Sequence, residues 1–222
     1  MTKYIITKNE IEKLAQIQWK KISTYLKLGI SWNDFLKKME QKARKGGMKF
    51  TGFSIAVNTD RPHWHGRFLE MPKKGWAFAF IGFIPNVKSK EKAEQLVSHE
   101  LFHIYQSLYL CIDYPDRLMG SFREACADVV SVRTVSSKKY QKAYTKGYYY
   151  TDSLIMALAD QMKNLGRDEL IELVNFPKTR KDLKPLTKRI VELLSKTDHT
   201  KWIKRIEKDF KKQGKIWWEV IR

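Results

Sequence analysis

The spacing of apolar and polar residues changes along the chain and predicts helices first and strands after them. Residues 8–45 place apolar side chains such as Ile11 and Leu14 near helical spacing, with lysines between them. This pattern predicts one or two amphipathic helices. After Gly46 the chain turns to short runs rich in aromatic and β-branched residues, which predict strands at residues 50–57, 67–71 and 76–84. The last run alternates large and small side chains, as in a strand with two different faces.

The remainder of the chain has a helical pattern. Ser89 is a plausible N-cap, and the helix that it opens can continue through Tyr109. After a loop that contains Pro115 and Gly120, residues 122–135 predict the next helix. From Tyr148 onward the pattern stays helical, with interruptions at Gly166, Pro177 and Pro185. Together these elements predict an α+β fold with a small mixed sheet and a largely helical C-terminal part.

Length and composition indicate a folded chain with one core. The chain has 222 residues, of which 43% are hydrophobic and 13% aromatic, values typical of globular proteins. We expect a single domain over 1–222, with a helical extension at 1–45, a catalytic core at 48–160 and a basic helical part at 161–222. No run of 18 apolar residues and no apolar signal core is present. With only two cysteines, both interpreted as reduced, we expect a cytoplasmic protein without a membrane span.

The net charge of +19 is distributed unevenly. Lys and Arg exceed Asp and Glu by 8 in residues 1–50 and by 11 in residues 131–222, whereas the two kinds balance in residues 51–130. Such basic termini could contact nucleic acid or an anionic surface. Solvated lysines on amphipathic helices are the simpler interpretation. The same two interpretations apply to the C-terminal tail, where Trp202, Phe210, Trp217 and Trp218 alternate with basic residues.

The segment His99-Glu100-Leu101-Phe102-His103 has the HExxH pattern. Histidines four residues apart lie on one face of a helix, where two neutral imidazoles can bind one divalent ion. The glutamate between them can act as a base toward water on that ion. The alternative is a pair of histidines that fill the edge of a core. His63 and His65 could form another site but are more simply turn residues.

A catalytic metal of this kind needs a third protein ligand. Glu124 follows His103 by 21 residues, enough for a loop and a returning helix. Asp128 lies four residues further, on the same helical face, where its carboxylate could accept a hydrogen bond from the outer nitrogen of a ligand histidine. Both acidic residues could instead be ordinary surface carboxylates. Cys126 is expected to point away from the site.

The pattern His99-Glu100-xx-His103 followed by Glu124-xxx-Asp128 resembles the gluzincin branch of the zincin metallopeptidases, the thermolysin-like arrangement. The resemblance covers about residues 75–160 and implies a zincin-like fold with one zinc per chain, bound by His99, His103 and Glu124. It implies hydrolysis of peptide bonds in a peptide or protein substrate, with Glu100 as the base toward zinc-bound water. Arg123 replaces the Asn that often precedes the third ligand.

The resemblance also implies two further roles. In that family the strand before the active helix is an edge strand that binds substrate by strand addition, a role that would fall to Ala77, Phe78, Ala79 and Phe80. A Tyr or His after the third ligand commonly stabilises the oxyanion, and Tyr149 is our preferred candidate among three adjacent tyrosines. Two alternatives remain: a metal-binding zincin-fold regulatory or sensing protein without efficient proteolysis, and a basic nucleic-acid-binding protein.

Overall fold

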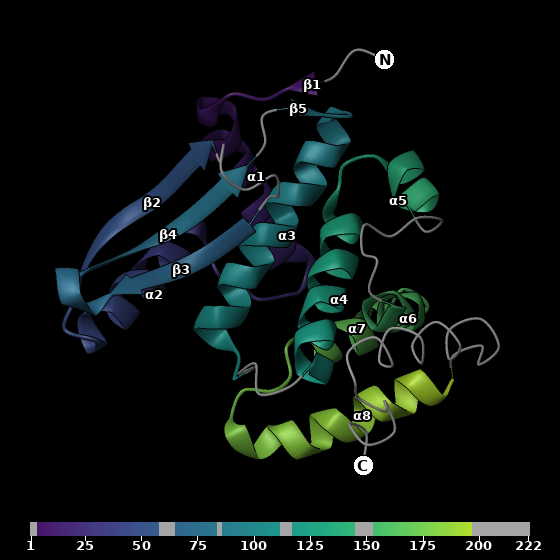
Figure 1. Ribbon diagram of the computed structural model, residues 1–222. Coiled ribbons are helices and arrows are strands. Elements are labelled where there is room, and N and C mark those ends of the chain that lie inside the picture. Colours follow the sequence, from purple (N-terminus) through teal and green to yellow (C-terminus); the bar gives the residue numbers. More distant parts are fainter. Residues whose placement is uncertain (1–3, 58–64, 84–85, 112–116, 145–152, 197–222) are drawn as a thin grey trace. The chain divides into compact units, whose positions relative to one another are not determined.

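The computed structural model describes residues 4–57, 65–83, 86–111, 117–144 and 153–196 (Figure 1). It is a mixed α/β chain with a small three-stranded sheet and mostly helical elsewhere. The chain divides into two compact units, which are described separately. The first contains residues 1–109 and 130–141, and the second contains residues 110–129 and 142–222. The assignment of all 222 residues to one domain stays a prediction.

The first unit begins with the two predicted amphipathic helices, α1 (Lys8–Tyr25) and α2 (Trp32–Lys45). A capping box starts α1, because the Thr7 side chain accepts from the backbone N–H of Glu10 and the Glu10 carboxylate accepts from the backbone N–H of Thr7. Ser31 caps α2 by accepting from the backbone N–H of Asp34. Each cap pairs N–H groups that have no partner inside the helix, which fixes where both helices begin.

Trp19 of α1 joins these two helices in the core. Its ring is fully buried and stacks on Phe35 of α2, with ring centroids 3.7 Å apart and planes 9° apart. The indole N–H donates to the carbonyl of Ile30 at 3.1 Å, in the loop between the helices. The side chain therefore supplies both apolar contact and a polar anchor for the loop.

Replacing Trp19 by Phe is expected to lower the free energy of unfolding by about 1–2 kcal/mol, because a smaller ring leaves space in the core and the Ile30 carbonyl loses one of its two donors, the other being the Ser23 hydroxyl. Urea denaturation measures this change. Trp32→Phe is the matched control, since Trp32 is only partly buried. Its ring is tilted 51° from that of Phe35, and the two ring centroids lie 6.0 Å apart. Equal losses for the two variants would contradict the structural role of Trp19.

The sheet of the first unit consists of β2 (Lys49–Val57), β3 (His65–Met71) and β4 (Trp76–Phe83). The strand order is β2-β4-β3, with β2 parallel and β3 antiparallel to β4. A separate pair joins β1 (Tyr4–Ile5) to β5 (Asn86–Val87). The three predicted strands are therefore present, but the expectation that the third is an edge strand is wrong. β4 is the middle strand, and its backbone bonds to a neighbour on both sides.

The alternation predicted for β4 separates the two faces of the sheet. Ala77, Ala79 and Ile81 are fully buried, whereas Trp76 and Phe78 are partly exposed. The small side chains allow helices to approach closely, and Ala77 forms a core cluster with Ala43 at the end of α2. In Figure 1 helices α1 and α2 lie behind the sheet. The alanine face therefore belongs to the core and the aromatic face lies opposite.

Helix α3 (Lys90–Tyr109) is the predicted motif helix and runs next to the outer strand β3. Its start agrees with the prediction, because Ser89 accepts through its side chain from the backbone N–H of Lys92 at 3.2 Å. The helix also packs against α1, where the buried hydroxyl of Ser98 donates to Gln18 at 3.0 Å. The contacts of α3 with α1 and β3 are the most extensive, and they hold α3 within the first unit.

Helix α4 (Arg117–Thr134) contributes residues to both units. It begins five residues before the predicted start and includes Gly120, which the sequence pattern assigns to the preceding loop. Helix α5 (Lys138–Tyr144) follows it. Helices α6 (Ser153–Met162), α7 (Arg167–Val174) and α8 (Leu183–Ser195) belong to the second unit. Pro185 lies in the first turn of α8, where a proline is tolerated, so it marks the start of a helix instead of a break.

Candidate metal centre

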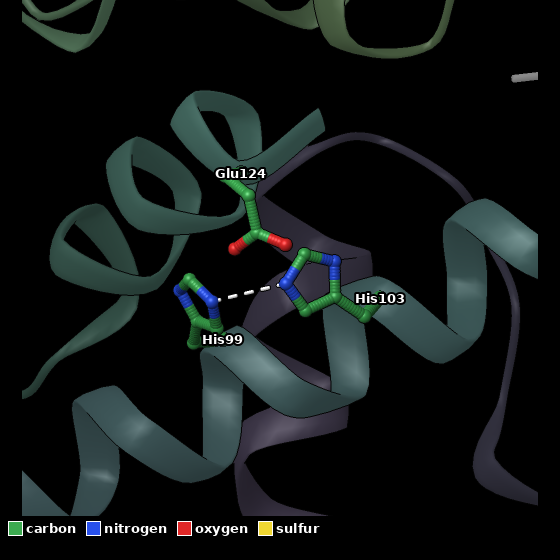
Figure 2. A group of neighbouring side chains, drawn as sticks. All are labelled: His99, His103 and Glu124. Atoms are coloured by element: carbon green, nitrogen blue, oxygen red, sulfur yellow. Dashed lines mark hydrogen bonds between the residues drawn. The ribbon is translucent and has the colours of Figure 1, made fainter. Parts of the chain in front are cut away.

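Two histidines of α3 direct their Nε2 atoms toward each other. His99 and His103 are 5% and 7% exposed, and their Nε2 atoms lie 3.0 Å apart. Two nitrogens bound to one tetrahedral zinc at 2.0–2.1 Å would be about 3.3 Å apart. The observed spacing therefore differs from a metal-bound geometry by only a few tenths of an ångström. The rings lie nearly perpendicular, at 84°, and present these nitrogens to one point in space (Figure 2).

The third predicted ligand joins this pair. One ligand atom each from His99, His103 and Glu124 lie within 4.8 Å of one another. Glu124 is on α4, and Figure 2 shows its carboxylate directed toward the two imidazoles of α3. Two imidazole nitrogens and one carboxylate oxygen form the donor set of a catalytic zinc site that keeps one position for water. The residues present therefore fit a divalent ion, and the cluster could hold a metal.

Side-chain contacts within the first unit fix the alignment of α3 with the last turns of α4. The buried amide of Gln95 donates to the hydroxyl of Ser131 at 3.3 Å. The carboxylate of Glu94 accepts from the backbone N–H of Ser136 at 2.9 Å, just after α4, and from Lys21 of α1 at 3.5 Å. Gln95 and Glu94 come about one turn before His99. These bonds therefore fix the position of α3 close to the two histidines.

Gln106 is a functional candidate that the sequence did not reveal. Its Oε1 lies 2.9 Å from Nδ1 of His103, and the side chain is 1% exposed. An amide oxygen can only accept, so this contact favours the His103 tautomer that has its proton on Nδ1 and the lone pair that a metal needs on Nε2. A Gln three residues after a ligand histidine is the available signal, but glutamines are common on helices and the pattern alone is weak.

Removing this contact is expected to weaken metal binding. Gln106→Leu should lower the affinity for zinc about 10- to 100-fold, because the acceptor that favours a proton on Nδ1 of His103 is then lost. Gln106→Glu should retain most of the affinity, since its carboxylate also accepts. Competition with a chromophoric chelator measures these affinities, and Gln16→Leu on the exposed side of α1 is the control. Equal affinities for wild type and Gln106→Leu would refute the role.

The remaining predicted residues have different outcomes. Glu100 is 5% exposed on α3, and Asp128 is 1% exposed on α4; the hydrogen bond predicted from a histidine to Asp128 stays a prediction. Cys126 is fully buried, and this burial raises the pKa of its thiol; its direction away from the ligands stays a prediction. Tyr149, His63 and the C-terminal tail lie outside the described residues, and the side chains of His65 and Phe80 are not described.

The substrate role predicted for β4 needs correction. Strand addition requires a strand with one unpaired side, but β4 pairs with β3 from Trp76 to Gly82 and with β2 from Trp76 to Phe83. Ala77 and Ala79 are in addition fully buried beneath the helices. The two outer strands of the described sheet are β2 and β3, and β3 is the one beside α3. An extended peptide that joins this sheet next to the motif helix would therefore pair with β3.

Comparison of the chain with protein-family models, with curated proteins and with solved structures finds no significant match in any of the three. Among the described helices, none is long and apolar enough to cross a membrane. The site must therefore be interpreted from its own geometry.

Proposed function

We propose that the chain is a zinc-dependent metallopeptidase of the gluzincin type with a zincin-like catalytic core. The observation that carries the proposal is the convergence of His99, His103 and Glu124 within 4.8 Å. Two of these ligands come from an HExxH helix and the third from a later helix, which is the donor set expected of a catalytic zinc. When bound, zinc would act as a Lewis acid toward water and toward the scissile carbonyl.

The other residues of the chain would perform the proton transfers and hold the substrate. Glu100 is the proposed base: its carboxylate accepts the proton of the attacking water and then donates it to the leaving amine. Its low exposure limits competing solvent, which favours proton transfer to the reacting groups. Gln106 orients His103 through Nδ1. Tyr149 stays the proposed donor to the oxyanion.

The substrate is proposed to be an extended peptide that adds to the outer strand β3. This strand runs beside α3, so a peptide paired with it would pass along the helix that carries the histidines. Its backbone would gain hydrogen bonds regardless of sequence, and the side chains would decide specificity. The cytoplasm stays the proposed location.

The test combines zinc binding with product analysis. The full chain, loaded with one equivalent of zinc, is incubated with a mixture of peptides of diverse sequence, and new ends are identified by mass spectrometry. We expect cleavage that stops on chelation and returns on addition of zinc. A protein that binds one zinc without cleaving any peptide would overturn the peptidase proposal and favour a metal-binding regulatory protein. Absence of zinc binding would contradict both the peptidase and the metal-binding regulatory protein.

A further inference from the structure

The aromatic face of the β2-β4-β3 sheet has the chemistry of a nucleic-acid surface. Trp76 and Phe78 of β4 point to this face, opposite the buried alanines, and their ring centroids lie 5.1 Å apart. Their register partners on β3 are Met71 and Leu69, so these side chains share the face. All four are partly exposed. Two aromatic rings on a sheet, flanked by aliphatic side chains, provide a flat surface on which bases can stack.

Basic residues collect at the end of the sheet where Trp76 lies. Lys49 is the register partner of Trp76, and Lys73 and Lys74 occupy the turn just before it. A backbone hydrogen bond of 2.9 Å from Lys49 to Gly75 joins these two segments. The ammonium group of Lys74 lies 5.7 Å from the centroid of the Trp76 ring. All three lysines are exposed, so their charges are available to an anion beside the rings.

Two more cations extend this basic end. Arg44 and Lys45 end α2, shortly before Lys49, and both are exposed. Acidic residues offset the charge only in part: Glu40 pairs with Arg44, and Glu70 is the register partner of Ala77, so it belongs to the helix-facing side. One block of excess positive charge lies in residues 1–50. The fold brings the end of that block to the lysine pair of the β3–β4 turn.

We propose that this surface, defined by Trp76, Phe78, Lys49, Lys73 and Lys74, binds single-stranded nucleic acid. The rings stack on unpaired bases, and the lysines neutralise the neighbouring phosphates. A single strand is favoured over a duplex because its bases expose their faces, whereas those of a duplex are stacked on one another. The surface does not depend on the metal centre.

The test is fluorescence anisotropy of a labelled 15-nucleotide oligo(dT) titrated with the full chain at low salt. Replacing Lys49, Lys73 and Lys74 together by Gln is expected to weaken binding at least tenfold and to reduce the slope of log K against log salt by about 2. The matched control replaces Lys8, Lys13 and Lys20, three exposed lysines of α1, by Gln and leaves the same net charge. It should change the affinity less than threefold.

Trp76→Ala separates stacking from charge and is expected to weaken binding about tenfold at unchanged salt slope. Circular dichroism and zinc content show whether Trp76→Ala remains folded. If it does not, Trp76→Tyr is the second variant: it keeps an aromatic ring and should retain binding. Three results would overturn the proposal: no binding at low salt, equal losses for both lysine triples, or binding to vesicles containing phosphatidylserine with none to the oligonucleotide.

Discussion

Replacing Glu124 by Ala is expected to lower the affinity for zinc at least 100-fold, so that protein purified without added metal contains much less than the wild type. The carboxylate is the only anionic member of the three-residue cluster. Two imidazoles on adjacent turns of one helix can hold zinc by themselves only weakly, and a third ligand from another helix closes the site. Elemental analysis of wild type and variant, purified side by side, measures the difference. Wild type should contain about one zinc per chain.

Two controls make this result specific to the site. Glu169→Ala removes an exposed carboxylate of α7 and should leave the zinc content unchanged. Glu124→Gln keeps the size of the side chain and one oxygen, so an intermediate affinity is expected if coordination, and not helix packing, is lost. Equal zinc contents in wild type and Glu124→Ala would show that this carboxylate is not a ligand. No zinc in the wild type after incubation with the metal would refute the centre as a whole.

The sequence predicted the elements of the first unit because their signals are local. Helical spacing located α1 and α2, the cap Ser89 located the start of α3, and alternation located β4. Alternation along a strand shows which of its side chains share a face. It does not show whether the strand has one neighbouring strand or two. The order of the sheet depends on pairings between residues far apart in the chain, and this is why the edge-strand prediction failed.

The candidate site was predictable to the extent that its chemistry follows from helical periodicity. The spacing of His99 and His103 placed them on one face, and Glu124 was predicted from the need for a third ligand. Gln106 was missed because a Gln in a helix has many ordinary roles, and only its distance to Nδ1 of His103 identifies one. The bond from Gln95 to Ser131 likewise joins two helices whose pairing no local pattern reveals.

Replacing Glu100 by Gln is expected to reduce peptide hydrolysis by a factor of about 10²–10⁴ while zinc binding is retained. An amide has nearly the size of the carboxylate, but it cannot accept the proton of the attacking water. Glu100 is not part of the three-residue ligand cluster, so its loss should leave the donors of the metal in place. The variant therefore separates chemistry from metal binding, whereas Glu124→Ala is expected to weaken both.

The measurement compares kcat/KM of the two zinc-loaded proteins on one peptide cleaved by the wild type. Glu91→Gln is the matched control, because Glu91 lies in the first turn of the same helix, two turns before His99. That variant should hydrolyse the peptide at close to the wild-type rate, since Glu91 is not part of the three-residue ligand cluster. Hydrolysis by Glu100→Gln at the wild-type rate would mean that another group accepts the proton, and the peptidase mechanism proposed for this helix would have to be abandoned.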